Sequence, residues 1–232
     1  MRRFMAVGAA ALWMAAPAAA LAQAQCRIPD KFEKPRAIFP PPGNAVIAAR
    51  TGHILALSWS PQFCKENGDD KKHASQCRDQ KFGFILHGLW ADGEGRNNPV
   101  WCKKVPAVPV EVMRRSYCAT PSPSLMQREW AKHGSCIAPD PASYYATATR
   151  MFNALRFPDM NKLSTQQIEI RDFVGAFVAA NPGMPESAVS VTLTPLGWLD
   201  EVKVCHDLDF RVRACPDKLA GTPRGARMKI WR

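Results

Sequence analysis

The pattern of apolar and polar positions changes twice along the chain. In the first part, the apolar runs 53–59 and 82–87 have the length and composition of buried strands. Pro61 is predicted to end the first strand, and Gly88 with the glycines that follow it is predicted to end the second. The charged stretch 65–81 between the two strands is predicted to be a loop.

Helical spacing replaces this pattern in the middle of the chain. The first predicted helix has Ser124 as its candidate N-cap and runs to His133, where Gly134 stops it. Two more helices are predicted over 142–156 and 165–180. The apolar side chains of both lie on one face, which is typical of helices that pack on a core.

Strands return in the C-terminal part. Residues 189–193 alternate between apolar and polar, 198–205 follow as a second strand, and 209–212 is predicted to close a hairpin. Strands, then helices, then strands indicate an α+β fold rather than a doubly wound sheet. Because no low-complexity linker or internal repeat divides residues 25–232, we expect them to form a single domain.

Residues 1–24 have the features of a signal peptide. Arg2 and Arg3 give a basic start, an alanine-rich apolar run follows, and residues 20–22 offer a small-x-small cleavage site. The run ends in this site rather than in a basic stop-transfer flank, and no second run is long enough to span a bilayer. We therefore expect a monomer in the periplasm or outside the cell, without membrane contact after cleavage.

The chain contains eight cysteines, an even number that predicts four disulfides in an exported protein. They are Cys26, Cys64, Cys77, Cys102, Cys118, Cys136, Cys205 and Cys215. None belongs to a C-x-x-C motif, which disfavours structural zinc and thiol–disulfide exchange. Eight cysteines allow on the order of 100 pairings, and proximity in sequence favours Cys64–Cys77 and Cys205–Cys215.

The chain is strongly basic. Its net charge of +11 at pH 7 falls by two to +9 without Arg2 and Arg3. Such a charge suits a polyanionic substrate or surface, although a need for solubility explains it equally well.

The densest group of chemically active residues lies in segment 127–136. On a helix, Glu129, Lys132 and His133 are spaced i, i+3 and i+4, so they project from one face. A solvated salt bridge beside a capping histidine is the structural alternative. The zinc-protease motif H-E-x-x-H fails at its first ligand, because Arg128 stands there.

His87 supplies a second candidate group at the end of a predicted strand. A purely structural histidine is the alternative at such a position. Gly88 beside it admits a close backbone approach, and Trp90 offers either a stacking platform for a nucleic-acid base or a core side chain.

RNA cleavage explains why these residue types belong together. The ribose 2′-hydroxyl attacks its own phosphorus when a base takes its proton, while an acid protonates the leaving 5′-oxygen. Two histidines perform both tasks near neutral pH. Lys132 can stabilise the extra charge of the transition state, and Glu129 can orient a histidine or, when protonated, donate a hydrogen bond to the phosphorane. This chemistry needs no metal and no cofactor.

These segments resemble the signatures of the ribonuclease T2 family. The first signature is similar to residues 84–90, Phe-Ile-Leu-His-Gly-Leu-Trp, and the second to residues 128–136, Arg-Glu-Trp-Ala-Lys-His-Gly-Ser-Cys. The likeness extends to residues 57–64 and to the paired cysteines near the C-terminus. It covers most of the mature chain, and two signatures in the right order are highly specific.

The resemblance implies an α+β fold with a central antiparallel sheet packed against several helices. It implies an endoribonuclease that cuts single-stranded RNA without metal, through a 2′,3′-cyclic phosphate to 3′-phosphate ends. His133 would then be the general base and His87 the general acid, with Glu129 and Lys132 stabilising the transition state. It also implies a Cys102–Cys136 disulfide that holds the catalytic helix, with Cys64–Cys77 and Cys205–Cys215 alongside, which leaves Cys26 to pair with Cys118.

Two positions depart from the family pattern. Arg128 replaces a phosphate-binding histidine of many members, so phosphate binding through a guanidinium is expected to remain. Ala91 stands where a proline is usual, which changes the adjoining base-binding loop. Asp92 in that loop is a candidate acceptor for an exocyclic amine such as that of adenine, or else a solvated turn residue.

An alternative function belongs to a different class. A secreted protein with this fold that binds polyanions without catalysis would share the charge and the disulfides. It would not depend on particular histidines, so a His133→Ala variant separates the two hypotheses.

Overall fold

In the computed structural model of the protein, residues 26–32, 35–41, 43–95 and 97–232 are described. The predicted signal peptide at 1–24 lies outside these residues. Within the described ranges, no helix has the length and apolar character needed to cross a membrane.

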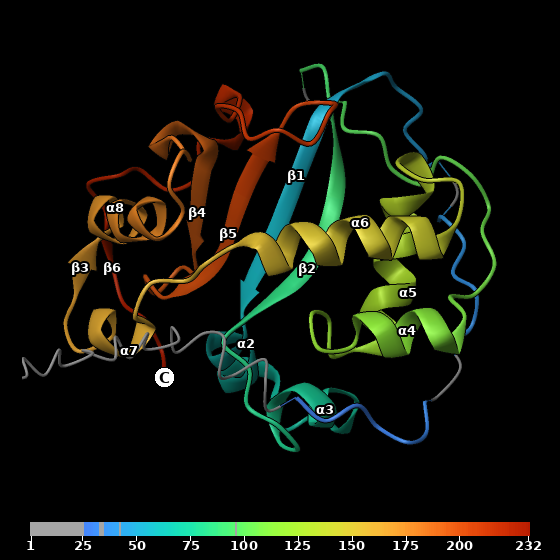
Figure 1. Ribbon diagram of the computed structural model, residues 1–232, viewed down its shortest axis with the longest axis horizontal. Coiled ribbons are helices and arrows are strands. Elements are labelled where there is room, and N and C mark those ends of the chain that lie inside the picture. The colour runs from blue at the N-terminus through green and yellow to red at the C-terminus, as the bar shows by residue number, and fades with distance from the viewer. Residues whose placement is uncertain (1–25, 33–34, 42, 96) are drawn as a thin grey trace, which may run out of the picture.

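An antiparallel sheet of four strands forms the centre of the molecule, in the order β2-β1-β5-β4 (Figure 1). The strands are β1 (Arg50–Trp59), β2 (Phe84–Gly93), β4 (Val189–Leu193) and β5 (Leu199–His206). A second, two-stranded sheet pairs β3 (Ile168–Glu169) with β6 (Arg227–Met228). The predicted α+β class with a central antiparallel sheet is therefore confirmed.

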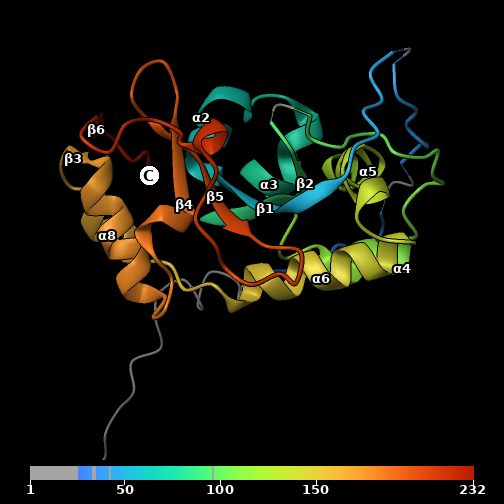
Figure 2. The same ribbon diagram turned by 90° about the horizontal axis from the view of Figure 1, so that it is seen from above.

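Helices cover both sides of the sheet. Seen from above, α6 and α4 lie along one side, and α2 and α3 lie on the other (Figure 2). The helices are α2 (Ser60–Asn67), α3 (Ala74–Cys77), α4 (Val110–Ser116), α5 (Pro123–Lys132), α6 (Pro141–Ala154), α7 (Met160–Leu163) and α8 (Ile170–Ala180). Short 3-10 turns lie at Lys71–His73, Gly134–Cys136, Glu186–Ala188 and Asp217–Leu219.

The core lies between one face of the sheet and helices α6 and α8. Leu57, Leu86 and Val202 reach it from three adjacent strands, and Phe152 and Phe173 reach it from the two helices. All five side chains are fully buried. Burying a side chain of this size contributes about 1.5 to 3 kcal/mol, so a Phe152→Ala substitution would destabilise the sheet that carries the site.

The stretch 65–81 is not the loop that its charge predicts. Pro61 lies in the first turn of α2, where a proline needs no N–H partner, so the chain passes from β1 directly into a helix. The Cys64–Cys77 disulfide then joins α2 to α3.

The predicted strand at 209–212 that closes a hairpin is only partly formed. β4 pairs with β5 only as far as Val204, and beyond it the returning chain bonds to the end of β5 through the Arg213 N–H, which donates to the Cys205 carbonyl. Only a single bridge joins His206 to Val212. The predicted helix over 165–180 begins later, at Ile170, because the two residues before it pair with β6.

The described cysteines form the four predicted disulfides. They join Cys26 to Cys118, Cys64 to Cys77, Cys102 to Cys136 and Cys205 to Cys215. These are the pairs that the family resemblance implies.

Candidate active site

A β-bulge in β2 sets the orientation of His87. The strand does not end at Gly88 as predicted but continues to Gly93. Ala56 of β1 faces Gly88 while Leu57 faces Leu86, so His87 is an extra residue in the pairing. Two residues three apart in a regular strand point to opposite faces, but the bulge brings His87 and Trp90 to the same face. Their ring centroids are 5.3 Å apart.

The outer edge of β2 is held on both sides of the bulge. The Thr120 hydroxyl donates to the Leu86 carbonyl at 2.8 Å, and the Leu86 N–H donates to the Ala119 carbonyl at 2.8 Å. On the other side, the Tyr144 hydroxyl lies 3.0 Å from both the N–H and the carbonyl oxygen of Leu89. The bulge is thus fixed by the loop before α5 and by α6.

Gly88 makes room for the acidic residue of the site. A β-carbon at this position would lie 2.4 Å from Oε2 of Glu129 and 2.8 Å from Nε1 of Trp90. The absence of a side chain therefore lets α5 approach β2, which is the close backbone approach that the sequence indicates.

Helix α5 delivers Glu129 and His133 to this face of the sheet. Its N-cap is Ser122 rather than Ser124, because the Ser122 hydroxyl accepts from the Leu125 N–H at 3.3 Å. The helix ends at Lys132, and His133 is its C-cap residue, with its N–H donating to the Glu129 carbonyl. Both Glu129 and His133 are buried.

The turn after His133 is tied down. The Cys102–Cys136 disulfide joins it to the loop that precedes α4. The Ser135 hydroxyl accepts from the Cys102 N–H and donates to the Ala131 carbonyl. These bonds restrict the movement of the His133 backbone.

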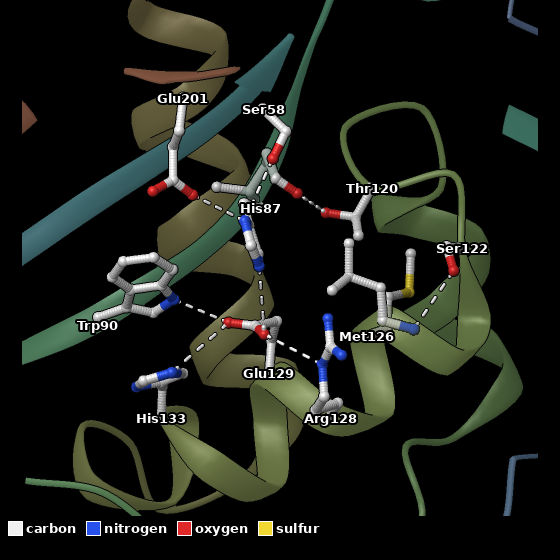
Figure 3. Close-up of polar contacts among 12 residues, drawn as sticks. Ser58, His87, Trp90, Thr120, Ser122, Met126, Arg128, Glu129, His133 and Glu201 are labelled. Atoms are coloured by element: carbon white, nitrogen blue, oxygen red, sulfur yellow. Dashed lines mark hydrogen bonds and ion pairs between the residues drawn. The ribbon is translucent and has the colours of Figure 1, made fainter. Parts of the chain in front are cut away.

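The Glu129 carboxylate is the centre of the site (Figure 3). Trp90 donates to its Oε2 from Nε1 at 2.8 Å. Nε2 of His87 lies 3.7 Å from Oε1, and Nε2 of His133 lies 3.9 Å from Oε2. The Trp90 ring also stacks on the His133 ring, with centroids 5.1 Å apart. The structure thus brings both predicted histidines to one carboxylate.

A second carboxylate, which the sequence interpretation missed, lies on the other side of His87. Oε1 of Glu201 is 2.8 Å from Nδ1 of His87, and the Ser58 hydroxyl is 3.2 Å from the same nitrogen. Oε2 of Glu201 pairs with the Lys203 ammonium at 2.8 Å. Alternation along β5 signals that Glu201 and Lys203 share a face, but only the strand order shows that this face is the one bearing His87.

The electrostatic surroundings shift the two histidines in opposite directions. Burial disfavours the charged form of His87, but the hydrogen bond to Glu201 and the charges of Glu129 and Glu201 outweigh it, so its pKa is raised. Burial lowers the pKa of His133 to about 3, and the positive charge of Lys132 acts in the same direction. Burial also raises the pKa of the Glu129 carboxyl, against the opposing charge of His87. Near neutral pH, His133 is therefore uncharged.

Lys132 and Arg128 lie at the margin of this group. Lys132 is partly exposed, and within the described ranges its ammonium forms no hydrogen bond or ion pair. Its charge nonetheless lowers the pKa of His133 and opposes the rise in that of Glu129. The Arg128 side chain is 57% exposed, with Nε 3.7 Å from Oε1 of Glu129.

A groove of about 500 Å³ opens beside His87 and Arg128. Its wall combines aromatic, polar and basic side chains from α2, the turn after it and the start of α5. They include Phe63, Asn67, Lys72, His73, Ser124 and Leu125. The groove therefore offers both cations and aromatic surface next to the partly exposed imidazole of His87.

Asp92 does not face this groove. It is buried and pairs with Arg213 at 2.6 Å and with Lys218 at 2.7 Å. The interpretation of Asp92 as a base-binding residue is therefore wrong, and so is its alternative as a solvated turn residue. Trp90 is partly exposed, so it is not the core side chain of the alternative. Its N–H and one ring face are engaged with Glu129 and His133, and stacking of a base on the ring stays a prediction.

In the part of the chain that the structure describes, no three His, Cys, Asp or Glu side chains are grouped so that they could hold a metal ion. The candidate site is thus made of two imidazoles, two carboxylates and the surrounding cations.

The chain is similar in sequence to known ribonucleases. Residues 52–173 match the model of the Ribonuclease T2 family. A "Probable ribonuclease" of Haemophilus influenzae is 30% identical over 178 residues, which cover 72% of this chain but 61% of that protein.

Solved structures share the fold at low sequence identity. Trichomaglin, described as a novel S-like ribonuclease, aligns with a TM-score of 0.63 at 18% identity, over 78% of this chain and 97% of that chain. RNase NT in complex with 5′-AMP aligns with a TM-score of 0.60 at 16% identity, over 78% of this chain and 98% of that chain.

Proposed function

Because the chain belongs to the ribonuclease T2 family, we propose that it is a metal-independent endoribonuclease that cuts single-stranded RNA by transphosphorylation. The observation that carries this proposal is the pair of imidazoles that flank the Glu129 carboxylate with pKa values displaced in opposite directions. The reaction needs one acid and one base, on either side of the reacting phosphate.

In the first step, Nε2 of His133 accepts the proton of the ribose 2′-hydroxyl. The 2′-oxygen bonds to phosphorus, the bond from phosphorus to the 5′-oxygen breaks, and Nε2 of His87 donates its proton to that oxygen. The products are a 2′,3′-cyclic phosphate and a free 5′-hydroxyl. In the second step water opens the ring with the two histidines in exchanged roles, which leaves a 3′-phosphate.

The remaining predicted residues stabilise the charge that develops on the phosphorane. Glu129, whose pKa is raised, donates a hydrogen bond when it is protonated. Lys132 supplies positive charge near the same carboxylate. Arg128 at the rim of the groove binds a phosphate, and the groove receives a neighbouring nucleotide of the RNA.

The proposal includes an oxidising compartment. The four disulfides are stable in a periplasm or outside the cell, and the predicted signal peptide directs the chain there. RNA that reaches such a compartment is then the substrate.

The chemistry of the product ends tests the proposal. Purified protein is incubated with RNA and with DNA of the same sequence in EDTA, and the ends are identified by mass spectrometry. We expect 2′,3′-cyclic phosphates that convert slowly to 3′-phosphates, and intact DNA. Ends bearing 5′-phosphate would contradict the mechanism, and RNA binding without cleavage would favour the non-catalytic polyanion-binding protein.

The pH dependence of the same assay provides a second test. His87 must be protonated and His133 neutral, so kcat/KM is expected to be bell-shaped. Because the pKa of His87 is raised, the alkaline limb is expected above the ordinary histidine value of about 6.5. An alkaline limb below that value would contradict the role of His87 as the acid.

A further inference from the structure

Glu201 forms a bridge between His87 and a lysine. One oxygen of its carboxylate is 2.8 Å from Nδ1 of His87, and the other is 2.8 Å from Nζ of Lys203. The Glu201 side chain is 13% exposed and that of Lys203 is 18% exposed, so both ion pairs are largely shielded from water. Figure 3 shows Glu201 on the side of His87 that is opposite Glu129.

We propose that Glu201, held by Lys203, is a positioning residue for His87 that fixes the orientation of the imidazole and the nitrogen through which it exchanges protons. This inference rests on the proposed function. It adds a residue from the C-terminal strand β5 to a site otherwise built from β2 and α5.

The hydrogen bond decides the tautomer of the neutral imidazole. With the Nδ1 proton donated to Glu201, the nitrogen that faces Glu129 is Nε2. After Nε2 has given its proton to the leaving 5′-oxygen, Nδ1 keeps its own. The imidazole is then left with an unprotonated Nε2, which is the form that accepts a proton from water in the second step. A single carboxylate thus prepares His87 for both steps.

Lys203 keeps the carboxylate in the form that this role requires. Burial favours the neutral acid, but the hydrogen bond to His87 and the charges of His87 and Lys203 hold the pKa of Glu201 below its ordinary value. Glu201 therefore stays ionised as an acceptor instead of taking the proton of His87. Nζ of Lys203 also lies 5.6 Å from the Trp90 ring, so Lys203 is packed within the site.

Several charged groups surround His87, and the experiment must separate them. From α5 come Glu129, Arg128 and, beyond Glu129, His133; from β5 come Glu201, Lys203 and Asp200. Glu201 alone among these accepts a hydrogen bond from Nδ1 in the described residues. Asp200 is a matched control, because it is an acid on the same strand that makes no such bond.

The test compares the full-length mature chain with its Glu201→Gln and Asp200→Asn variants. The rates of cleavage of a dinucleoside monophosphate are measured from pH 4 to 9, and the His87 ring is titrated by ¹⁵N NMR. We expect Glu201→Gln to move the alkaline limb and the His87 titration down by about 1 to 3 pH units. At pH 7, kcat should fall about 10-fold while KM changes less than about 2-fold, because Glu201 does not line the groove. Asp200→Asn should shift the alkaline limb and the His87 titration by less than about 0.3 pH units.

Two results would overturn the inference. One is an unchanged alkaline limb in Glu201→Gln, and the other is an equal shift in Asp200→Asn. If Glu201→Gln does not fold, Glu201→Asp replaces it, since the shorter acid keeps the charge but lengthens the hydrogen bond and should give an intermediate shift. If the wild-type chain does not cleave RNA, the proposed function fails, while the NMR titration still tests the pairing of Glu201 with His87.

Discussion

Two clusters of histidine and charged side chains lie on the same sheet and differ in what the carboxylates face. In the groove cluster, made of His87, Glu129, Glu201 and Arg128, both carboxylates point at a histidine. In the rim cluster, made of His53, His206, Asp92 and Arg213 near one end of β1, β2 and β5, the carboxylate pairs with cations instead.

The histidines of the rim cluster are consequently uncharged. Nδ1 of His53 donates to the Asp207 carbonyl at 2.9 Å, and Nδ1 of His206 donates to the Val204 carbonyl at 3.0 Å. Burial lowers the pKa of both, to about 4 for His206. The comparison shows that burial, together with nearby cations, keeps a histidine neutral. A hydrogen-bonded carboxylate outweighs burial at His87, whereas the Glu129 carboxylate 3.9 Å from His133 does not.

Substituting either histidine of the candidate site should reduce activity far more than substituting a histidine of the rim cluster. His87→Ala and His133→Ala are each expected to reduce kcat by about 100- to 10,000-fold, because an acid or a base of the reaction is lost. His206→Gln should retain nearly full activity at pH 7. The measurement is RNA cleavage by folded protein, and a comparable loss in His206→Gln would show that the two clusters are not functionally distinct.

Asp92→Asn tests the rim cluster through stability. It leaves the Arg213 guanidinium and the Lys218 ammonium facing an uncharged amide. We expect the free energy of unfolding to fall by about 3 kcal/mol. This is the lower end of the range for removing one partner of a buried ion pair, because both cations are partly exposed. Urea denaturation measures it. The base preference of cleavage should not change; a changed preference with unchanged stability would mean that Asp92 contacts a base.

Acidification should weaken the fold through the neutral histidines. Because the pKa of His206 is about 4 when folded and about 6.5 when unfolded, the unfolded chain binds more protons between these values. The stabilisation is complete above about pH 6.5 and is lost as the pH falls toward 4. At pH 5 the loss is about 2 kcal/mol for this residue.

The protonation of His87 changes the stability with pH in the opposite direction. Its raised pKa gives a stabilisation that is present below about pH 6.5 and is lost as the pH rises through the folded value. Unfolding midpoints from pH 4 to 8 check both trends. His206→Gln should flatten the acid side of this curve, and an unaltered acid slope would contradict the role of His206.

Arg128→Gln is expected to have the smallest effect. The partly solvated guanidinium contributes a phosphate contact, so KM should rise a few-fold at low salt and the difference should shrink as salt is added. Arg115→Gln on α4 is the matched control, since that exposed arginine lines a different cavity. A large fall in kcat with an unchanged KM would instead give Arg128 a role in the chemical step.

The sequence predicts the class of fold, the strands of the central sheet and three of the helices, but not α2, α3, α4 or α7. The strand at 189–193 has the predicted bounds, although its burial does not alternate as the sequence does, since Ser190 is buried along with Val189 and Val191. The helix predicted over 142–156 is found at 141–154. The missed helix α2 illustrates the limit, since a proline that ends one element can equally begin the next.

The site is predicted where its residues are close in sequence and missed where strand pairing brings them together. Glu129 and His133 are one helical turn apart, so their common face follows from the spacing. Glu201 is 114 residues from His87, and only the position of β5 beside β1 makes them neighbours. The bulge that turns His87 toward Trp90 is likewise a property of strand register, which alternation does not encode.

The place of β5 in the sheet makes the surroundings of His87 depend on a segment that is synthesised long after it. β5 is made late but lies between β1 and β4, so a nascent chain that ends before residue 199 has an unpaired edge on β1 and no carboxylate on Nδ1 of His87. A ribosome-bound chain of that length already carries His87, His133 and Glu129. It nevertheless lacks β5, so we expect the site to stay incomplete until that strand has joined the sheet.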